Sequence, residues 1–600
     1  MKVAVIGSGL AGLTTAYLLR KEGIEVWLIE KSDKLGFHSQ SIEIPITSNK
    51  GEAENFTRND STGVNTKNEK AKEKEKEEKW VVDVPMRGFQ GGYYPLLLSL
   101  YHHLGIPLQT ANYTFSFSSS IPSSTYFIHS GSSGYSWPSL PSRAYSNLFI
   151  LIKDIGTWFG VAICYLMLVL LSFMGYHDLL PLCVTESSVT LREFTISLST
   201  FLAYPFTIPY FNYTPWTPLG GLFQDFFIGK IVIPLFSSVG TMTTSDVWSL
   251  PVRIILEYIY LTLGTNHYQL SKGFSAASIA DLLVGPVQKQ GSDHVRLSTE
   301  LSSLEYIAAS QDSGDIGGSV KISMRKCDAS DAETSEELLV DKVILATQAS
   351  VAKYLLAGLE DSLGNTRQDT EKRRVSEMRA ALHKIRYRKT IVVTHRDTSI
   401  LPAPKDRRDI NFLLPEISSS PYLQYLSNTQ SSTDDQVPFF IPISGKVYTQ
   451  ATQIMQPPRN LVTKCRPEVV VLQTTNPALP IDPRKVLSVS KLERALPLKE
   501  PGKVLAFLRT NTPESCVYIV GSYAYPGIPL LEGCVGSAKL AVENIIRNTI
   551  PRPKPQFIRH RWHQEEVEPK KDIGGVNWEI GKGDKLQRWW RWRWIQTGWS

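Results

Sequence analysis

The pattern of apolar and polar positions over the first thirty residues predicts a strand, a helix and a second strand. Residues 3–6 form an apolar run without polar alternation, which is typical of a buried parallel strand. Apolar residues then recur at helical spacing from Leu13 to Leu19, and Gly23 ends this predicted helix. Residues 25–29 predict the next strand. The pattern therefore indicates an α/β fold that begins with the chain itself.

Later apolar runs predict two more buried strands. One lies within residues 341–349 and ends in a turn of small residues, and the other is residues 517–520, followed by Gly521. Alternation over residues 295–304 predicts a pair of strands, and a helix is predicted from about Glu532 to Ile546.

A glycine-rich turn joins the first strand to the first helix. In this turn Gly7 allows a tight bend, Gly9 lets a pyrophosphate approach the backbone, and Gly12 lets the helix pack closely on the strand. The helix N-terminus offers N–H groups and a partial positive charge to phosphates. Glu30 ends the second strand, where it can accept hydrogen bonds from ribose hydroxyls. We predict a dinucleotide site at Gly7, Gly9, Leu10, Ala11, Gly12 and Glu30. The motif alone leaves FAD and NAD open, and a glycine-rich turn in another kind of α/β protein is the alternative.

The most apolar stretch is residues 157–175, which carry no charge. A run of 18 or more such residues is a transmembrane candidate. The alternatives are a buried helix, a helix lying on a membrane, or the wall of an apolar cavity. Because segments of the nucleotide-binding domain are predicted on both sides of it, a single crossing would separate that domain's halves. We therefore favour membrane contact or an apolar pocket over a full span.

Two segments have a composition that favours no packed core. Residues 49–79 hold eight basic and eight acidic residues with almost nothing apolar, which predicts a disordered charged insertion. A charged partner-binding tract is the alternative. The tail, residues 549–600, is basic and carries seven of the thirteen tryptophans after residue 560. Alternating Trp and Arg over 588–599 suits a membrane interface, with a functionless tail as the alternative.

Bulk composition limits the class of protein. At 600 residues and 42% hydrophobic, the chain is long enough for two or more domains. Its six cysteines form no CxxC pair, which argues against a zinc site or a disulfide framework and favours a reducing, intracellular compartment. We expect no signal peptide, because the first core strand begins at once. Of the net charge of +7, +5 lies within residues 551–600, so the rest has no nucleic-acid footprint.

The residues that follow Glu30 carry a resemblance to a known family. Gly36 and His38 match a Leu-Gly-Gly-His loop, although Phe37 replaces its second glycine and Ser41 its threonine. In this loop, in an Ala-Thr strand end at residues 346–347 and in the Gly521–Ser537 segment, the chain resembles the FAD-dependent amine oxidase and phytoene desaturase superfamily. Within that superfamily the loop is similar to a branch of flavin oxidoreductases without an assigned substrate.

The resemblance implies an FAD cofactor and several contacts to it. The helix after Gly521 is expected to point its N-terminus at the flavin, where negative charge collects on reduction. Ser522 stands where the family often has an acid. No cysteine occupies the Ser-Gly-Gly-Cys position of covalently flavinylated amine oxidases, so non-covalent FAD is expected. Beyond the glycine turn and Glu30, the implied cofactor contacts are Lys31, Gly36, His38, Arg87, Leu301, Gly521, Leu531 and Glu532.

The resemblance also implies the domain organisation. It predicts a Rossmann-like, discontinuous FAD-binding domain, with a parallel sheet and helices on both faces, plus an α+β substrate domain. The predicted FAD-binding segments are residues 1–48, 80–114, 267–349 and 471–548, and the substrate-domain segments are residues 115–266 and 350–470.

The implied reaction is hydride transfer from a substrate C–H bond to flavin N5. The apolar middle of the chain and its Trp-rich tail favour an apolar or lipid-like small molecule as substrate. No catalytic residue is assigned. His267 is more typical of a helix-end cap, and His395 with Asp397 of a hydrogen-bonded strand end, than of acid–base catalysts. An NAD(P)-dependent dehydrogenase and a membrane-associated scaffold without activity are the alternative functions.

Overall fold

The structure is a computed structural model, and its description covers most of the chain up to Thr549. The insertion at 49–79 (apart from Lys79), the tail beyond Thr549, His38 and Arg87 lie outside the described residues, as do the predictions made for them. The described residues are 1–36, 41–45, 79–85, 88–119, 124–129, 131, 139–180, 189–203, 220–271, 274–308, 318–327, 335–363, 369–415, 447–455, 470–509, 512 and 515–549.

A five-stranded parallel sheet contains the first strand of the chain. Its order is β10-β2-β1-β14-β20, so β1 lies in the middle, between strands that are distant in sequence. Val3 pairs with Val26 on one side and with Lys342 on the other. The apolar runs predicted these strands because both faces of the sheet are covered. Their bounds are β1 Lys2–Ile6, β2 Glu25–Ile29, β10 Val295–Arg296, β14 Lys342–Leu345 and β20 Val517–Ile519.

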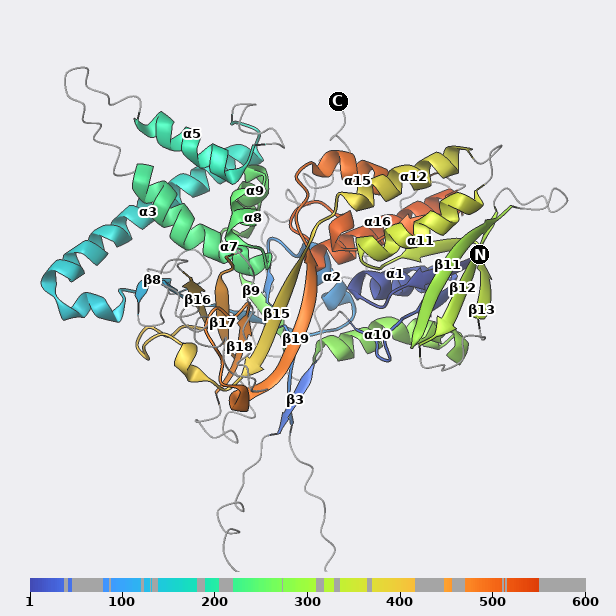
Figure 1. Ribbon diagram of the computed structural model, residues 1–600, viewed down its shortest axis with the longest axis horizontal. Coiled ribbons are helices and arrows are strands. Elements are labelled where there is room, and N and C mark those ends of the chain that lie inside the picture. Colours follow the sequence, from blue (N-terminus) through green and yellow to red (C-terminus); the bar gives the residue numbers. More distant parts are fainter. Residues whose placement is uncertain are drawn as a thin grey trace, which may run out of the picture.

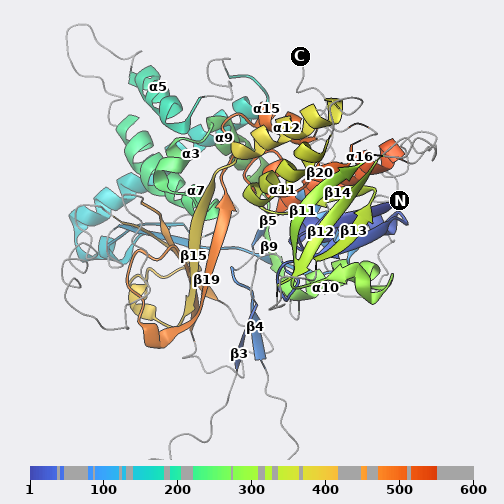
Figure 2. The same cartoon turned by 45° about the vertical axis from the view of Figure 1, so that its right-hand side comes forward.

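Alternate residues of β1 enter the cores on opposite faces of this sheet. Val3 and Val5 join the core with helices α1 (Leu10–Lys21), α10 (Ala276–Gln288) and α16 (Leu531–Thr549). Ala4 and Ile6 join the other core, which these elements supply: α11 (Ala349–Ser362), α12 (Asp369–His383), α15 (Pro501–Arg509), and the antiparallel strands β11 (Thr299–Ile307), β12 (Ser319–Lys326) and β13 (Ser335–Val340). The predicted parallel sheet with cover on both faces is confirmed, and most of it occupies the right-hand part of Figures 1 and 2.

The parallel sheet with the elements that cover it forms one body of the structure. A seven-stranded mixed sheet forms the second body. Its order is β19-β15-β18-β17-β16-β7-β8, and β16 with β7 is its parallel pair. The long strands β19 and β15, at one edge of this sheet, lie on the side that faces the parallel sheet and its helices in Figure 1. The bounds are β7 Phe115–Ser119, β8 Thr125–His129, β15 Tyr387–His395, β16 Ile410–Leu414, β17 Gln450–Met455, β18 Val471–Thr475 and β19 Val486–Ala495.

Apolar helices gather beside this second sheet, on the left of Figure 1. The longest is α3 (Leu148–Tyr176), which begins where the side chain of Asn147 accepts a hydrogen bond from the Phe149 N–H. It contains the apolar stretch 157–175 singled out above. By length and composition alone, α3 and the segment Leu222–Val239 are apolar enough to cross a membrane. The others are α5 Leu191–Ala203, the π-helical segment Leu222–Val232, α7 Ile233–Val239, α8 Thr244–Trp248 and α9 Val252–Thr262.

Two small sheets and several short helices complete the described chain. Strands β3 (Ile42–Pro45) and β4 (Lys79–Val82) pair antiparallel, with Pro45 opposite Lys79. A three-stranded sheet has the order β5 (Phe89–Gln90), β9 (His267–Leu270), β6 (Leu108–Ala111). The remaining elements are α2 Pro95–His103 and the 3₁₀ turns Ser142–Ser146, Ser292–His294, Thr398–Ile400, Pro483–Lys485 and Ser522–Ala524.

Two segments lie elsewhere than the predicted division of domains assigned them. Helices α11 and α12 belong to the predicted substrate segment 350–470, yet their apolar side chains pack with Val343 and Leu345 of the parallel sheet. Strands β18 and β19 belong to the predicted FAD-binding segment 471–548, yet both pair with β15 of the mixed sheet. Packing of helices in the first case and strand pairing in the second, both between residues far apart in sequence, decided these positions. The division into two functional domains itself stays a prediction.

Candidate dinucleotide-binding site

Each glycine of the first turn occupies its position for a different geometric reason. Gly7 has φ +101°, and a Cβ on it would lie 2.8 Å from the carbonyl oxygen of Ala346. A Cβ on Gly12 would overlap the carbonyl oxygen of Gly7, so only glycine lets α1 lie this close to the turn. Gly9 differs, because no atom of the described residues lies within 4 Å of the position that its Cβ would take. The space beside Gly9 is therefore open on the side where a ligand would approach.

Helix α1 begins at this open space. Gly9 is its N-cap residue, makes no side-chain capping bond, and is followed by a first turn without an acidic residue. Its carbonyl oxygen accepts from the Leu13 N–H at 2.9 Å, as a helix requires. The N–H groups of the first turn lie at the positive end of the helix dipole. An anionic phosphate fits this end of α1.

Glu30 is held at the end of β2, against the same turn. Its Oε2 accepts from both the N–H and the hydroxyl of Ser8, each at 2.7 Å, and its Oε1 accepts from the Ser32 N–H at 2.9 Å. Burial would raise the pKa of this carboxyl group, but the hydrogen bonds from Ser32 and Ser8 outweigh it and lower the pKa. Glu30 is thus an ionised acceptor, as ribose recognition needs. Sequence reasoning did not single out Ser8, although it lies within the glycine motif.

The strand that carries Leu301 begins beside Glu30. The Glu30 N–H donates to the Arg296 carbonyl at 2.8 Å, and its own carbonyl accepts from the Thr299 N–H at 2.9 Å. Lys31 extends to Glu300, with 2.6 Å between Nζ and Oε1. The structure therefore brings Lys31 and the start of β11 to the acid. Contacts of Lys31, Leu301 and Gly36 with a cofactor stay predictions.

Two later segments of the chain return to the edge of the parallel sheet where the Gly7 turn lies. One follows β14, and the other, called the return segment below, consists of β20, the Gly521 turn and the start of α16. The Val520 N–H donates to the Leu345 carbonyl at 3.1 Å, and the Tyr523 hydroxyl donates to the Thr347 carbonyl at 2.8 Å. Gly521 has φ +152°, and its N–H donates to the Ser537 hydroxyl oxygen at 3.0 Å. Since Ala346 also touches the Gly7 turn, three segments far apart in sequence meet at the carboxyl ends of β1, β14 and β20. In α/β sheets that edge is where ligands bind.

The side chain of Glu532 bonds to another helix. Its side chain is buried and accepts from the N–H of Leu96 at 3.0 Å and from that of Leu97 at 3.0 Å. These N–H groups begin α2, so the carboxylate satisfies the unpaired donors and the dipole of that helix. The carboxylate of Glu532 thus caps α2, and the cofactor contacts expected at Leu531 and Glu532 stay predictions.

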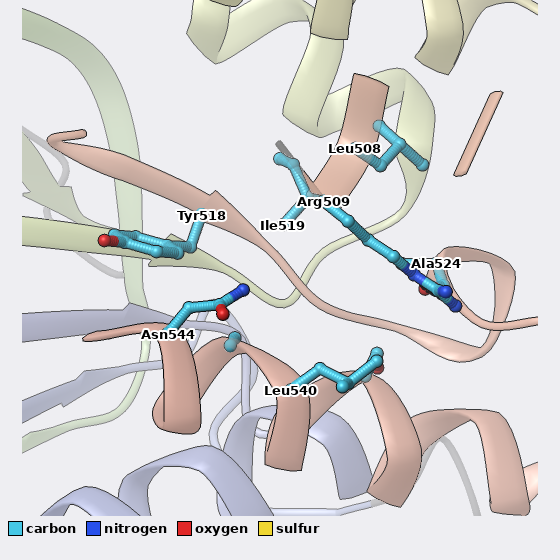
Figure 3. Close-up of a pocket in the computed structure, with 9 residues that line it drawn as sticks. Leu508, Arg509, Tyr518, Ile519, Ala524, Leu540 and Asn544 are labelled. Atoms are coloured by element: carbon cyan, nitrogen blue, oxygen red, sulfur yellow. Dashed lines mark hydrogen bonds between the residues drawn. The ribbon is translucent and has the colours of Figure 1, made fainter. Parts of the chain in front are cut away.

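A pocket behind the Gly521 turn is lined by α15, β20 and α16, and Figure 3 shows its side chains. Arg509 extends along it, and its guanidinium donates to the Ala524 carbonyl at 3.2 Å. Burial lowers the pKa of Arg509 to about 10, so the group is still a cation at neutral pH. Arg509 thereby fixes the loop that follows Gly521.

The three candidate acid–base residues, His395, Asp397 and His267, contact other residues of the protein, and each has a lowered pKa. His395 is fully buried, accepts from the Asp397 N–H at Nδ1 (3.1 Å), and lies 2.8 Å from the Thr474 hydroxyl at Nε2. Burial lowers its pKa to about 4. Asp397 accepts from Ser399, from the Asp482 N–H and from Lys485, and the pKa of its carboxyl group falls to about 2 because these hydrogen bonds outweigh burial. His267 lies on β9 with its ring against Tyr113, and burial lowers its pKa to about 4.

The described part of the chain offers no place for a metal among its acidic, His and Cys side chains. No group of three or more of them is close enough to hold an ion there. The four cysteines within those residues form no disulfide bond there; they are Cys164, Cys327, Cys516 and Cys534.

The geometry defines a class of fold. A parallel sheet whose first strand runs through a glycine turn into a helix, with an acid ending the second strand, is a Rossmann-type dinucleotide-binding fold. In agreement, residues 5–64 match the family model of an NAD(P)-binding Rossmann-like domain.

Solved structures with a related arrangement are, by their names, oxidases of amines. Cyclohexylamine oxidase from Brevibacterium oxydans is 11% identical, with 91% of this chain and 98% of that chain covered and a TM-score of 0.46. Putrescine oxidase bound to putrescine is 12% identical, with 91% and 99% covered and a TM-score of 0.45. Likeness at this level carries no argument about function or site residues. No curated protein is significantly similar to the sequence.

Proposed function

We propose that this chain is an FAD-dependent oxidoreductase, similar to flavin amine oxidases, that binds FAD without a covalent bond. The observation that supports this most is the meeting of three glycine or small-residue turns, at Gly7, Ala346 and Gly521, on one sheet edge beside Glu30. A bound flavin would supply the hydride acceptor.

The residues at this edge fit the adenosine and pyrophosphate part of the cofactor. The open space at Gly9 and the N-terminus of α1 would hold the pyrophosphate. The ionised Glu30 would accept from the ribose hydroxyls. Both groups also suit NAD(P), so they do not by themselves distinguish the two cofactors.

The return segment favours FAD over NAD(P). A simple NAD-binding domain would give no role to the strand β20, the Gly521 turn and α16, which begins at Leu531 just beyond that turn. The N-terminus of a helix stabilises negative charge, and a reduced flavin carries such charge at its pyrimidine edge.

The substrate in this proposal is an apolar small molecule that loses a hydride from a C–H bond. Aromatic side chains beside the return segment support it: the Tyr93 ring lies 4.7 Å from that of Tyr258, and the Tyr93 hydroxyl oxygen accepts from the Ile528 N–H at 2.7 Å. Such walls would orient a substrate and exclude water. No side chain is assigned as a catalytic base.

The test is a visible spectrum of the purified full chain, followed by titration of the apoprotein with FAD, NADH and NADPH. We expect absorbance near 370 and 450 nm, roughly as for any oxidised flavin. Glu30→Ala should weaken FAD binding at least about tenfold, since a charged hydrogen-bond acceptor is worth about 1.5–3 kcal/mol. The matched control is Glu337→Ala, an exposed acid on β13 whose carboxylate pairs with Lys321 instead.

A colourless protein that cannot be reconstituted with FAD would overturn the proposal. If such a protein bound NADH or NADPH in a Glu30-dependent way, the dehydrogenase alternative would replace it. If it bound none of the three, the scaffold alternative would stand.

A further inference from the structure

Helix α3 exposes an apolar stripe along its whole length. Apart from Lys153 and Gly156, every exposed residue of this helix has a large apolar side chain. The exposed fraction is 74% at Phe149, 68% at Leu166 and 59% at Leu170. Successive members are mostly three or four residues apart, so they lie on one side of the helix. The stripe comprises Leu148, Phe149, Ile152, Ile155, Phe159, Ile163, Leu166, Leu170 and Phe173.

The opposite side of α3 is packed into the second body. Val161, Cys164 and Leu168 are buried in the same core as α9 and the π-helical segment. Near its beginning, the buried Asp154 pairs with Arg143 at 2.9 Å. At its end, the Tyr176 ring stacks on that of Tyr260, with 4.1 Å between centroids. Helix α3 is therefore a fixed part of the folded chain, with one face covered and one face open.

The stripe is larger than a soluble monomer ordinarily exposes. From Leu148 to Phe173 it runs roughly 38 Å, at 1.5 Å per residue. With roughly 100 Å² exposed by each side chain, its area is on the order of 1,000 Å², against about 300–600 Å² for the largest patch of a typical monomer. A surface of this size marks a binding site.

We propose that this stripe is the surface by which the protein lies on a lipid membrane. Protein interfaces carry about one hydrogen bond per 100–200 Å² and a polar rim, whereas the exposed side chains of α3 supply a single polar group, on Lys153. Aliphatic and Phe side chains with a lysine at one end match the acyl and headgroup layers of a bilayer. The basic tail, residues 551–600, adds a preference for anionic lipid by its charge.

The helix lies in the membrane surface and does not cross the bilayer. A crossing would pull Val161, Cys164 and Leu168 from their core and carry the Arg143–Asp154 ion pair into lipid, at a cost of several kcal/mol. In Figure 1, α3 runs along the margin of the molecule farthest from β11–β13, so a membrane at this margin would leave the parallel sheet in water.

This inference does not rest on the proposed oxidoreductase function, because its assay needs no FAD. The full chain is mixed with vesicles of phosphatidylcholine containing about a third phosphatidylserine, and bound protein is measured by flotation. In the test variant, serine replaces Phe159, Leu166 and Leu170. The matched control variant replaces Leu339, Val351 and Tyr354, exposed residues on β13 and α11, by serine.

We expect the test variant to lose at least about a hundredfold in vesicle partitioning, because half or more of each side chain would leave lipid. The control variant should bind as the original chain does. Circular dichroism shows whether both variants are folded. If the triple variant fails to fold, the single change Leu166→Asp is used, with an expected loss of about tenfold or more.

Several results would overturn the proposal. One is unchanged vesicle binding by the test variant, and another is equal loss in the control. A third is binding that disappears only when the tail residues Trp589, Trp590, Trp592 and Trp594 are replaced by serine. A dimer in lipid-free buffer that the test variant dissociates, with no vesicle binding by the original chain, would assign the stripe to a second copy of this chain.

Discussion

The substitution Gly9→Ala tests the proposed pyrophosphate site with little effect on the fold. Gly9 has φ −61° and ψ 170°, which alanine adopts without strain, and the part of the chain that the structure describes has no atom within 4 Å of the added Cβ. Alanine reduces unfolded-chain entropy by about 0.4–1 kcal/mol, and its weaker N-cap preference offsets a similar amount. We therefore expect the free energy of unfolding of the apoprotein to change by less than about 1 kcal/mol.

Cofactor binding should respond very differently. The new methyl group would occupy the open space where a phosphate meets the N–H groups of α1. Loss of one charged hydrogen bond costs about 1.5–3 kcal/mol, which weakens FAD binding by roughly ten- to hundredfold. Urea unfolding of the apoprotein gives the first quantity, and quenching of flavin fluorescence during titration gives the second.

Two other glycines serve as controls. In Gly12→Ala the added Cβ would overlap the Gly7 carbonyl oxygen, so stability should fall by about 1–3 kcal/mol or more. In Gly156→Ala, within α3, the Cβ meets no atom of the described residues within 4 Å, so stability should rise by about 0.5–1 kcal/mol with FAD binding unchanged. The reasoning is refuted if Gly9→Ala binds FAD within twofold of the original chain, or destabilises the apoprotein as Gly12→Ala does.

Three further predictions concern groups assigned to structure. Glu532→Gln should lower the free energy of unfolding by about 2 kcal/mol, because α2 loses a charged cap. The control Glu543→Gln, also on α16, should change it by less than about 0.5 kcal/mol. The midpoints of urea unfolding measure both changes, and equal effects would contradict the capping role of Glu532. His395 has a folded pKa of about 4 against 6.5 ordinarily, so it binds its proton more readily when unfolded. The free energy of unfolding should therefore fall by about 3 kcal/mol from pH 6.5 to 4 because of His395, and His395→Gln should remove this part of the pH dependence. Asp397 has a folded pKa of about 2 against 3.8, so its stabilisation, about 2 kcal/mol, should be full above pH 4 and lost towards pH 2. The measurement is the free energy of unfolding of Asp397→Asn as the pH is lowered from 4 to 2. If it falls as steeply as that of the original chain, the Asp397 carboxylate is not the cause of the loss of stability.

Membrane contact illustrates how a sequence pattern and a structure contribute differently. The uncharged run 157–175 predicted contact with a membrane or an apolar pocket, and left the two open. Which residues of the run are available depended on the packing of α3 against α9, since Val161 and Leu168 are buried while Leu166 and Leu170 are exposed. Hydropathy counts all four alike, so no sequence window separates them.

What the sequence alone determined is the beginning of the chain. The apolar run of β1, the glycines of the turn, α1 and Glu30 lie within thirty contiguous residues, and each acts through its own local chemistry: apolar burial, absence of a Cβ, a charge at a strand end. Only the tertiary structure decided which distant segments meet this unit. It assigned the Glu532 carboxylate to α2, placed α11 and α12 on the parallel sheet, and left His395 neutral within a core. These outcomes depend on contacts between residues tens to hundreds of positions apart, which local periodicity does not encode.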